Sequence, residues 1–292
     1  MQSPNQSLSR REALVGLLAT FAMASAPKSA AAAISKQIDE TREQLTLPTF
    51  IKYENPAFGR AEHEAFHKEL EARYGFAKDP HLTRWTSNPE QVYVNKNAGE
   101  SIHIVGVNLK ENYAEMVWVL APAYINAEGQ RVLAHVPFEH IHSNQEEQFE
   151  KLCGEVNAQV NGVILQAEKT DFFSALPEDD HIAWNSGATP LAMRVRYYPA
   201  FGRDGERALM TYWGLVNEPE RTTDTGAPKN FALLGALNAH LGPQALATGM
   251  PAFLPKVAHP FLVNPLNRKE VCDLYRELTG EEHPEAIEAR EP

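Results

Sequence analysis

Hydrophobic and polar residues alternate with a period of two along the middle of the chain, beginning at Gln91. This period places successive side chains on opposite faces of a strand and is typical of β-sheet. Segments with this pattern are QVYVNK (91–96), SIHIVGVNL (101–109), AEMVWVLA (114–121), RVLAHVPFEHIH (131–142), GEVNAQVNGVILQ (154–166), LAMRVRYY (191–198) and RALMTYWGLV (207–216). Asn161-Gly162 predicts a tight two-residue hairpin turn within the fifth segment. The pattern predicts an antiparallel barrel over residues 91–216.

Helical spacing flanks this central region. Residues 35–46 are expected to form a polar helix or lead-in, and Phe66, Leu70 and Tyr74 form one stripe of a predicted helix over 60–74. Two further helices are expected over 228–241 and 264–280, each followed by a glycine. The predicted division is therefore a signal segment at 1–34, a helical segment at 35–90, the barrel at 91–216 and a helical extension at 217–292.

The first 34 residues predict export. Arg10 and Arg11 stand in the sequence SRREAL, which resembles a twin-arginine signal with Ala13 in place of the usual Phe. The apolar run that follows ends at Ala26, is short for a membrane span, and precedes a small-residue cleavage site at 30–33. We expect a periplasmic or secreted bacterial protein without stable membrane insertion after cleavage.

Charge and cysteine content narrow the functional classes. The formal net charge of −11 argues against nucleic acid or an anionic membrane surface as a partner. The two cysteines, Cys153 and Cys272, are compatible with an oxidising compartment, and a buried free thiol is expected at Cys153. Whether the two are paired is left open at this stage.

Candidate chemistry is concentrated between residues 140 and 185. His140 and His142 are two apart on a predicted strand and therefore face one side, as two ligands of one ion must. Glu147 lies at an odd offset, but a break at 143–145 can return it to the same side. His181 opens the next predicted strand. These residues predict one metal site at the mouth of a small barrel.

The same residues resemble the cupin superfamily. Its first motif, G(X)5HXH(X)3,4E(X)6G, is met by His140, His142, Glu147 and Gly154. Its second motif, G(X)5PXG(X)2H(X)3N, is met by Pro177, His181 and Asn185, with the proline-to-histidine spacing one residue short. Departures from the motif glycines are Ala134, Asp171 and Asp179.

The resemblance implies a mainly β jelly-roll cupin barrel that holds one divalent transition metal on His140, His142, Glu147 and His181. Iron is the first expectation, with manganese, nickel or zinc as alternatives. The implied function is a dioxygenase-type oxidoreductase acting on a small organic substrate. Metal-dependent isomerase, lyase or decarboxylase chemistry, and a non-catalytic periplasmic binding role, stay open. A homodimer is also left open.

Two further sets of residues are candidates for substrate or metal binding. Arg194 and Arg196 share one strand face, and if that face is inward, one of them would bind a substrate carboxylate. His63 and His67 form an HExxH sequence, which on a helix is the signature of zinc peptidases. Charged neighbours and the lack of a clear third ligand favour a solvated helix face for this second set.

Overall fold

The computed structural model describes residues 47–76, 80–83, 91–142, 144–165, 170–239 and 265–284. The chain divides into two units, residues 1–49 and 50–292, and the fold described here is that of the second. The predicted signal segment and lead-in helix lie outside the described residues. Among the described helices, none is long and apolar enough to cross a membrane.

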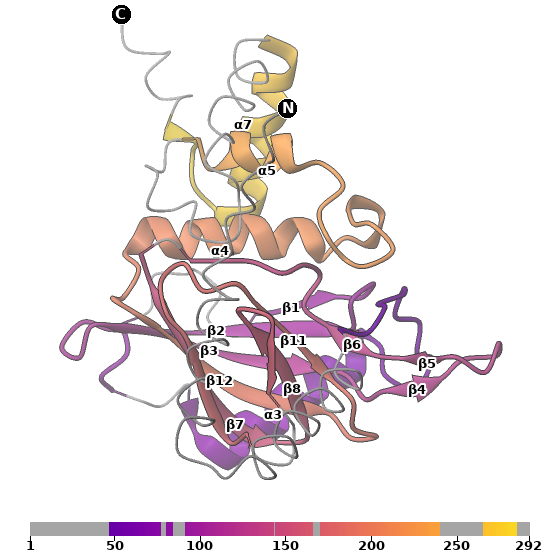
Figure 1. The fold of residues 1–292 in the computed structure, drawn as a ribbon. Coiled ribbons are helices and arrows are strands. Elements are labelled where there is room, and N and C mark those ends of the chain that lie inside the picture. The colour runs from indigo at the N-terminus through magenta and orange to yellow at the C-terminus, as the bar shows by residue number, and fades with distance from the viewer. Residues whose placement is uncertain are drawn as a thin grey trace, which may run out of the picture. The chain divides into compact units, whose positions relative to one another are not determined.

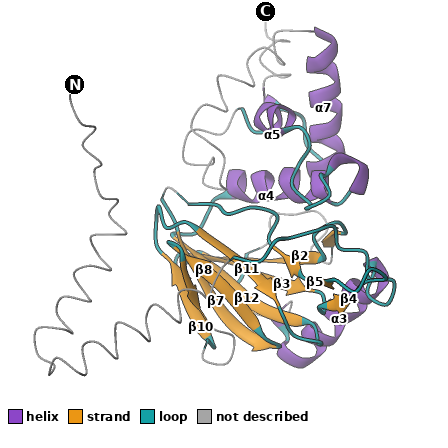
Figure 2. Cartoon of the chain, turned by 45° about the vertical axis from the view of Figure 1, so that its right-hand side comes forward, coloured by secondary structure: helices purple, strands orange, loops and turns teal. Residues whose placement is uncertain are grey.

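Two antiparallel sheets form the centre of the fold (Figures 1 and 2). The larger sheet has the order β1 (Val92–Asn95), β2 (Glu100–Asn108), β3 (Tyr113–Leu120), β12 (Leu191–Tyr198), β7 (Glu146–Cys153) and β10 (Phe172–Ala175). The smaller has the order β6 (Ala134–His135), β11 (His181–Asn185), β8 (Val156–Val160) and β9 (Val163–Leu165), and β4 (Tyr124–Ile125) pairs with β5 (Arg131–Val132). The prediction of a mainly β fold with flanking helices is confirmed.

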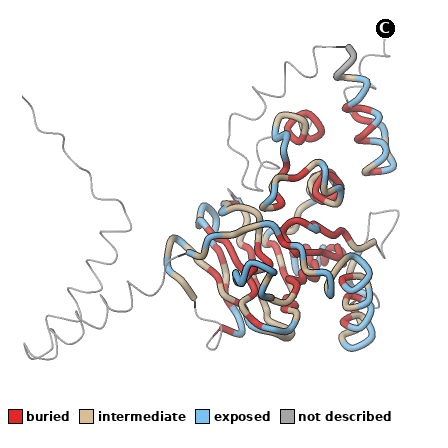
Figure 3. The backbone as a smooth tube through the Cα atoms, turned by 90° about the vertical axis from the view of Figure 1, so that its right-hand side faces the viewer, coloured by how far each residue is buried: buried red, intermediate tan, exposed pale blue. Residues whose placement is uncertain are grey.

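The larger sheet is covered on both faces. Figure 3 shows in red the buried parts of the chain. Its inner face contributes residues such as Ile102, Met116 and Val195 to the main core. Helix α3 (Arg60–Tyr74) packs on its outer face, where Leu70 meets Val117 in a separate apolar cluster. Every residue of β2 and β3 is therefore buried, because both alternating sets of side chains have a partner.

The hairpin predicted at Asn161-Gly162 is present. β8 pairs with β9 on either side of it, and both turn residues have positive φ angles of 49° and 70°. These left-handed angles define the turn type that the Asn-Gly pair favours. Gly154 has a φ of 83°, and a Cβ there would lie 2.5 Å from the carbonyl oxygen of Pro190. Only glycine fits this close approach between β7 and the start of β12.

The segment 207–216 is a helix, and the prediction of a strand there was wrong. It belongs to α4 (Arg203–Val216), which lies across the barrel in Figure 1. Leu209, Trp213 and Val216 follow the i, i+4, i+7 spacing of a helix, and all are buried in the barrel core. Because the segment is a short run rich in apolar and aromatic residues, its sequence pattern is similar to that of a buried strand.

Both predicted C-terminal helices are present within the described residues. α5 (Phe231–Leu237) and α7 (Pro265–Thr279) pack with α4 through Leu215, Leu234 and Tyr275. Gly280 follows α7 with a φ of 73°, as its position after the helix predicts. Cys272 of α7 and Cys153 of β7 are free thiols, and Cys153 is only half-buried, so the prediction of burial there was wrong.

Candidate metal centre

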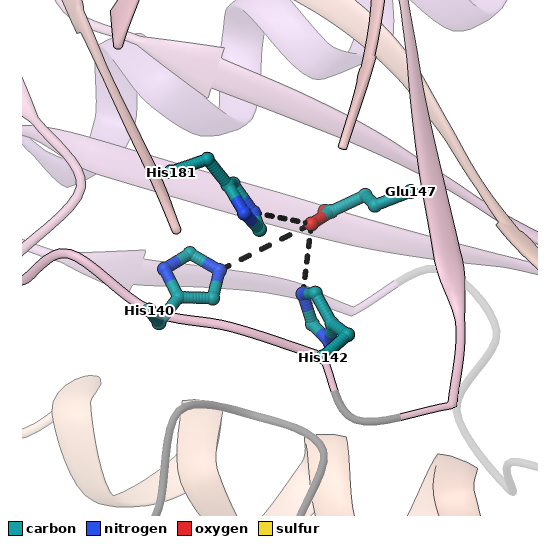
Figure 4. A group of neighbouring side chains, drawn as sticks. All are labelled: His140, His142, Glu147 and His181. Atoms are coloured by element: carbon teal, nitrogen blue, oxygen red, sulfur yellow. Dashed lines mark hydrogen bonds and ion pairs between the residues drawn. The ribbon is translucent and has the colours of Figure 1, made fainter. Parts of the chain in front are cut away.

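Four side chains converge at one wall of the barrel (Figure 4). Glu147 Oε2 lies 2.8 Å from His142 Nε2, 2.9 Å from His181 Nε2 and 4.0 Å from His140 Nε2. One potential ligand atom from each residue lies within 4.8 Å of the others. The structure thus brings together all four residues that the sequence singled out, and the group could hold a metal ion.

Backbone pairing fixes the group. His140 and His181 face each other across an antiparallel bridge, and each backbone N–H donates to the other's carbonyl, at 3.0 and 2.9 Å. The carbonyl of His142 accepts from the backbone N–H of Glu178 at 2.7 Å. Glu147 is the second residue of β7 and is paired there with Tyr197 of β12. Each side chain therefore projects from backbone that is held by hydrogen bonds, which limits its freedom.

The remaining imidazole nitrogens show which atoms are free to bind a cation. His140 Nδ1 lies 3.3 Å from the carbonyl oxygen of Phe138, and His181 Nδ1 lies 3.0 Å from that of Asp179. A carbonyl oxygen only accepts, so each Nδ1 carries the proton and a neutral ring presents a lone pair at Nε2. The Nε2 atoms of His142 and His181 are hydrogen-bonded to Glu147 Oε2 at 2.8 and 2.9 Å, and a cation at this point would replace the protons of those hydrogen bonds. The donor set therefore fits a metal ion.

Burial and mutual charge set the protonation of this group. Burial, helped by the neighbouring imidazoles, lowers the pKa of His140 to about 3. Burial also acts on Glu147, but the adjacent His142 and His181 outweigh it and hold the pKa of that carboxyl well below its usual range. Burial lowers the pKa of His181, but the hydrogen bond and charge of Glu147 outweigh it and raise that pKa. A metal ion at the site would take the place of the proton that the Glu147–His181 pair otherwise holds.

Tyr197 completes the arrangement and was missed by the sequence reasoning. Its hydroxyl donates to Glu147 Oε1 at 2.6 Å, so that Oε2 is the oxygen that faces the imidazoles. Burial and the Glu147 carboxylate raise the pKa of Tyr197 well above its usual value, which keeps the hydroxyl protonated. The two-residue period of β12 places Tyr197 on the same face as the buried Val195, and that signal could have found it.

A cavity of about 90 Å³ adjoins the four residues. Its wall is mainly apolar and comes from both sheets and from α4, which contributes Leu209, Tyr212 and Trp213. Other wall residues are Ile102, Met116, Trp118, Val136, Pro137, Phe138, Phe149, Ala183 and Val195. The group of four therefore borders a mainly apolar pocket that suits a small molecule.

Glu100 is a second carboxyl in the cavity wall, and the sequence reasoning did not single it out. It is 2% exposed, and its two oxygens accept from Asn95 Nδ2 at 2.9 Å and Trp118 Nε1 at 3.3 Å. Burial raises the pKa of Glu100 to about 8. An acidic residue that opens an otherwise apolar strand is the only sequence signal that marks it.

Arg194 and Arg196 do not line the cavity, which corrects the expectation that one of them anchors a substrate there. Val195 and Tyr197 point inward from β12, so Arg194 and Arg196, which alternate with them, point outward. Arg196 Nε donates to Glu115 at 2.8 Å, and Arg194 Nη1 donates to Glu150 at 3.0 Å. Both guanidinium groups thus serve ion pairs on the outer face of the sheet.

The HExxH residues are buried, so the prediction of a solvated helix face was wrong. His63 and His67 are 1% and 3% exposed, and Ser101 Oγ lies 2.7 Å from His63 Nδ1 and 2.9 Å from His67 Nε2. Burial lowers the pKa of His63 to about 3. Within the part of the chain that the structure describes, the His140 group is the one set arranged as metal ligands. His63 and His67 instead connect α3 to β2 through Ser101.

Asn185, the last residue of the second motif, has a structural role. Its Nδ2 donates to the carbonyls of Ala121 and Thr189 at 3.0 and 2.8 Å, and its Oδ1 accepts from the backbone N–H of Gly187 at 2.8 Å. The side chain thereby ties the end of β11 to the loop that leads into β12 and to the end of β3. Asn185 does not belong to the group of four.

Comparisons with known proteins cover less than half of the chain. No protein-family model and no curated protein matches the chain. A solved RmlC-like cupin from Shewanella frigidimarina shares 19% identity over 41% of this chain and 95% of its own, with a TM-score of 0.30. Pac13 from Streptomyces, a nucleoside dehydratase, shares 15% identity over 41% and 86%, with a TM-score of 0.29. The cupin domain of Schizosaccharomyces pombe Cnp3 shares 12% over 34% and 63%, with a TM-score of 0.28.

Proposed function

We propose that this protein is an exported, metal-dependent enzyme that acts on a small organic molecule in the barrel cavity. The observation that carries the proposal is the convergence of three imidazole nitrogens on one carboxylate at the wall of a mainly apolar cavity. Histidine and carboxylate ligands that leave coordination positions open suit iron(II), and manganese, nickel or zinc also accept them. His140, His142, Glu147 and His181 would hold the ion.

The preferred reaction class is oxidation by dioxygen. A bound redox-active metal would supply electron transfer at the cavity wall, and a mixed histidine and carboxylate ligand set with open positions favours that use. This chain's own residues perform the remaining tasks. Tyr197 holds the Glu147 carboxylate in place, and the apolar wall excludes water from the reacting molecule.

The first test is metal content. Elemental analysis of the protein purified from its native compartment is expected to give about one transition metal per chain. His142→Ala and His181→Ala are each expected to lose it, because every ligand removed leaves an incomplete set. Near-stoichiometric metal in both variants would contradict the assignment of the site.

The second test separates the reaction classes. Oxygen uptake is measured with the iron-loaded protein and a panel of small organic compounds, with the zinc-loaded protein as the control that cannot change redox state. Uptake that requires iron supports the oxidoreductase. Turnover without oxygen uptake, by either metal form, would instead favour Lewis-acid isomerase or lyase chemistry. Ligand retention without turnover under every condition would favour the binding protein.

A further inference from the structure

The cavity holds a carboxyl that the metal centre does not use. Glu100 lies at the start of β2 and borders the same cavity as His140 and Glu147. Its hydrogen-bond partners, Asn95 Nδ2 and Trp118 Nε1, are both donors. Asn95 Nδ2 also donates to the carbonyl of Gly226, so the Glu100–Asn95 pair also tethers the loop around residue 226.

At neutral pH, Glu100 carries a proton, and the two atoms directed at its oxygens, Asn95 Nδ2 and Trp118 Nε1, are both donors. The acceptor of the Asn95 side chain, Oδ1, makes no hydrogen bond and is turned away from Glu100. Its pKa of about 8 keeps the carboxyl largely protonated at pH 7. The donor atoms of Asn95 and Trp118 occupy its oxygens but take no hydrogen from it. A buried O–H without an acceptor is costly, and the cavity is the space in which an acceptor can be placed.

The rest of the cavity wall indicates which kind of molecule could supply that acceptor. No lysine or arginine is among the described residues of the wall, so a bound anion would meet no side-chain cation there. Tyr212 of α4 contacts Phe138 at a ring separation of 6.4 Å, and Phe138 contacts His140 at 5.9 Å. Aromatic side chains thus run along the wall toward the metal centre. These surroundings favour an uncharged, mainly apolar occupant.

We propose that the cavity binds a small, uncharged, mainly apolar molecule that bears an oxygen acceptor, and that Glu100 donates its carboxyl hydrogen to that oxygen. The acceptor is of the carbonyl or ether class. The proposal that the opposite part of the molecule lies at His140, His142, Glu147 and His181 rests on the proposed function. The hydrogen bond from Glu100 does not require the metal, so the two proposals can fail separately.

A matched pair of probes tests the hydrogen bond. Cyclopentanone and methylenecyclopentane have nearly the same shape, but only the ketone offers an oxygen acceptor. Binding of each is measured by calorimetry or NMR titration on the zinc-loaded protein and on His142→Ala. The ketone is expected to bind at least about tenfold more tightly in both proteins, since one hydrogen bond to a buried group gives this order of preference. A preference that disappears in His142→Ala would assign it to the metal and overturn the role of Glu100.

Two variants locate the preference at Glu100. Glu100→Met removes the donor and is expected to bring the two affinities within about threefold of each other. Glu100→Gln keeps a hydrogen-bond donor and is expected to retain most of the preference. An unchanged preference in Glu100→Met would overturn the proposal, as would equal or absent binding of the two probes by the original protein. A purely structural role of Glu100 predicts lower stability in Glu100→Met with the preference intact.

The pH dependence provides a readout that does not depend on the folding of Glu100→Met. Ketone affinity is expected to fall as the pH rises through about 8, because the ionised carboxylate has no hydrogen to donate. Tyr212 is the titratable group that faces Glu100 from α4, and its pKa lies well above the usual value, so it stays neutral in this range. Glu100→Gln is expected to show no such fall. The infrared band of a protonated carboxylic acid at pH 7, lost in Glu100→Gln, is the matching signature, and its absence would overturn the proposal.

Discussion

The Tyr197 hydroxyl donates to Oε1 of Glu147 at 2.6 Å, while Oε2 of the same carboxylate faces the histidine nitrogens. This hydrogen bond gives the two oxygens of the carboxylate different roles. One is occupied by the protein, and the other is presented to the site. Without the bond, the carboxylate could rotate and offer either oxygen or both.

We therefore expect Tyr197→Phe to weaken metal binding about 10- to 100-fold while the barrel stays folded, as loss of a hydrogen bond to a ligand commonly does. Competition with a chelator of known affinity measures the effect. Tyr198→Phe is the matched control, because Tyr198 packs against Tyr113 and does not border the cavity. Equal metal affinity in the two variants would show that Tyr197 does not position the ligand.

The HExxH pair is expected to affect stability and not metal content. His63→Ala with His67→Ala empties two buried positions and leaves Ser101 without either partner, which we expect to cost about 2–5 kcal/mol of unfolding free energy. Denaturant unfolding measures the cost, and elemental analysis should show unchanged metal in the folded fraction. Loss of metal from this variant, with metal kept in His142→Ala, would favour the peptidase hypothesis.

The same histidines predict a pH dependence of stability. The pKa of His63 falls from 6.5 to about 3 on folding, so between these values the unfolded chain binds more protons than the folded one. Its contribution to stability is therefore complete above pH 6.5 and declines as the pH falls toward 3. Melting temperatures at pH 7 and 5 should differ less in His63→Gln with His67→Gln than in the original protein.

Removal of an outer-face arginine should leave the cavity intact. Glu115 is 5% exposed and accepts from Arg196 Nε, so Arg196→Met leaves a buried acceptor poorly paired. We expect a loss of about 1–3 kcal/mol in unfolding free energy with metal content and probe binding unchanged. A change in probe affinity without a change in stability would restore the hypothesis that this arginine contacts the substrate.

Export is expected to require the arginine pair. Arg10→Lys with Arg11→Lys keeps the charge but alters the motif that a receptor recognises, so the precursor should accumulate in the cytoplasm. Cell fractionation and immunoblotting measure the distribution. Normal accumulation of the variant outside the cytoplasm would indicate the general secretory route.

The sequence was most informative where spacing and backbone geometry agree. His140 and His142 flank one residue, and the predicted alternation correctly put both on one wall, although the structure has no named strand there and only an isolated backbone bridge from His140 to His181. Arg194 and Arg196 obey the same alternation, but the sequence does not state which face is inward. Tyr197, one residue further, would have answered that question, because a tyrosine alternating with Met193 and Val195 favours the apolar side.

Other features could not be predicted from the sequence, because they depend on packing between distant segments. The burial of His63 and His67 requires Ser101, which is more than thirty residues away and offers a hydroxyl to both rings. Helix α4 was taken for a strand because residues 207–216 form a short run of mostly apolar and aromatic residues, which is ambiguous between a strand and a helix. The helical spacing of Leu209, Trp213 and Val216, all on the barrel side, was the signal that could have decided between them.

Helix α4 closes the cavity with side chains that lie outside the barrel motifs. The ligand group comes from the strands and their loops, whereas Leu209, Tyr212 and Trp213 come from the helix. The two parts can therefore change independently. Exchanging one face of α4 would reshape the chamber and alter which molecules fit, while the four residues His140, His142, Glu147 and His181 keep their positions. A fold of this kind can change which molecule it admits through a single helix, without disturbing the side chains that the strands and loops hold together.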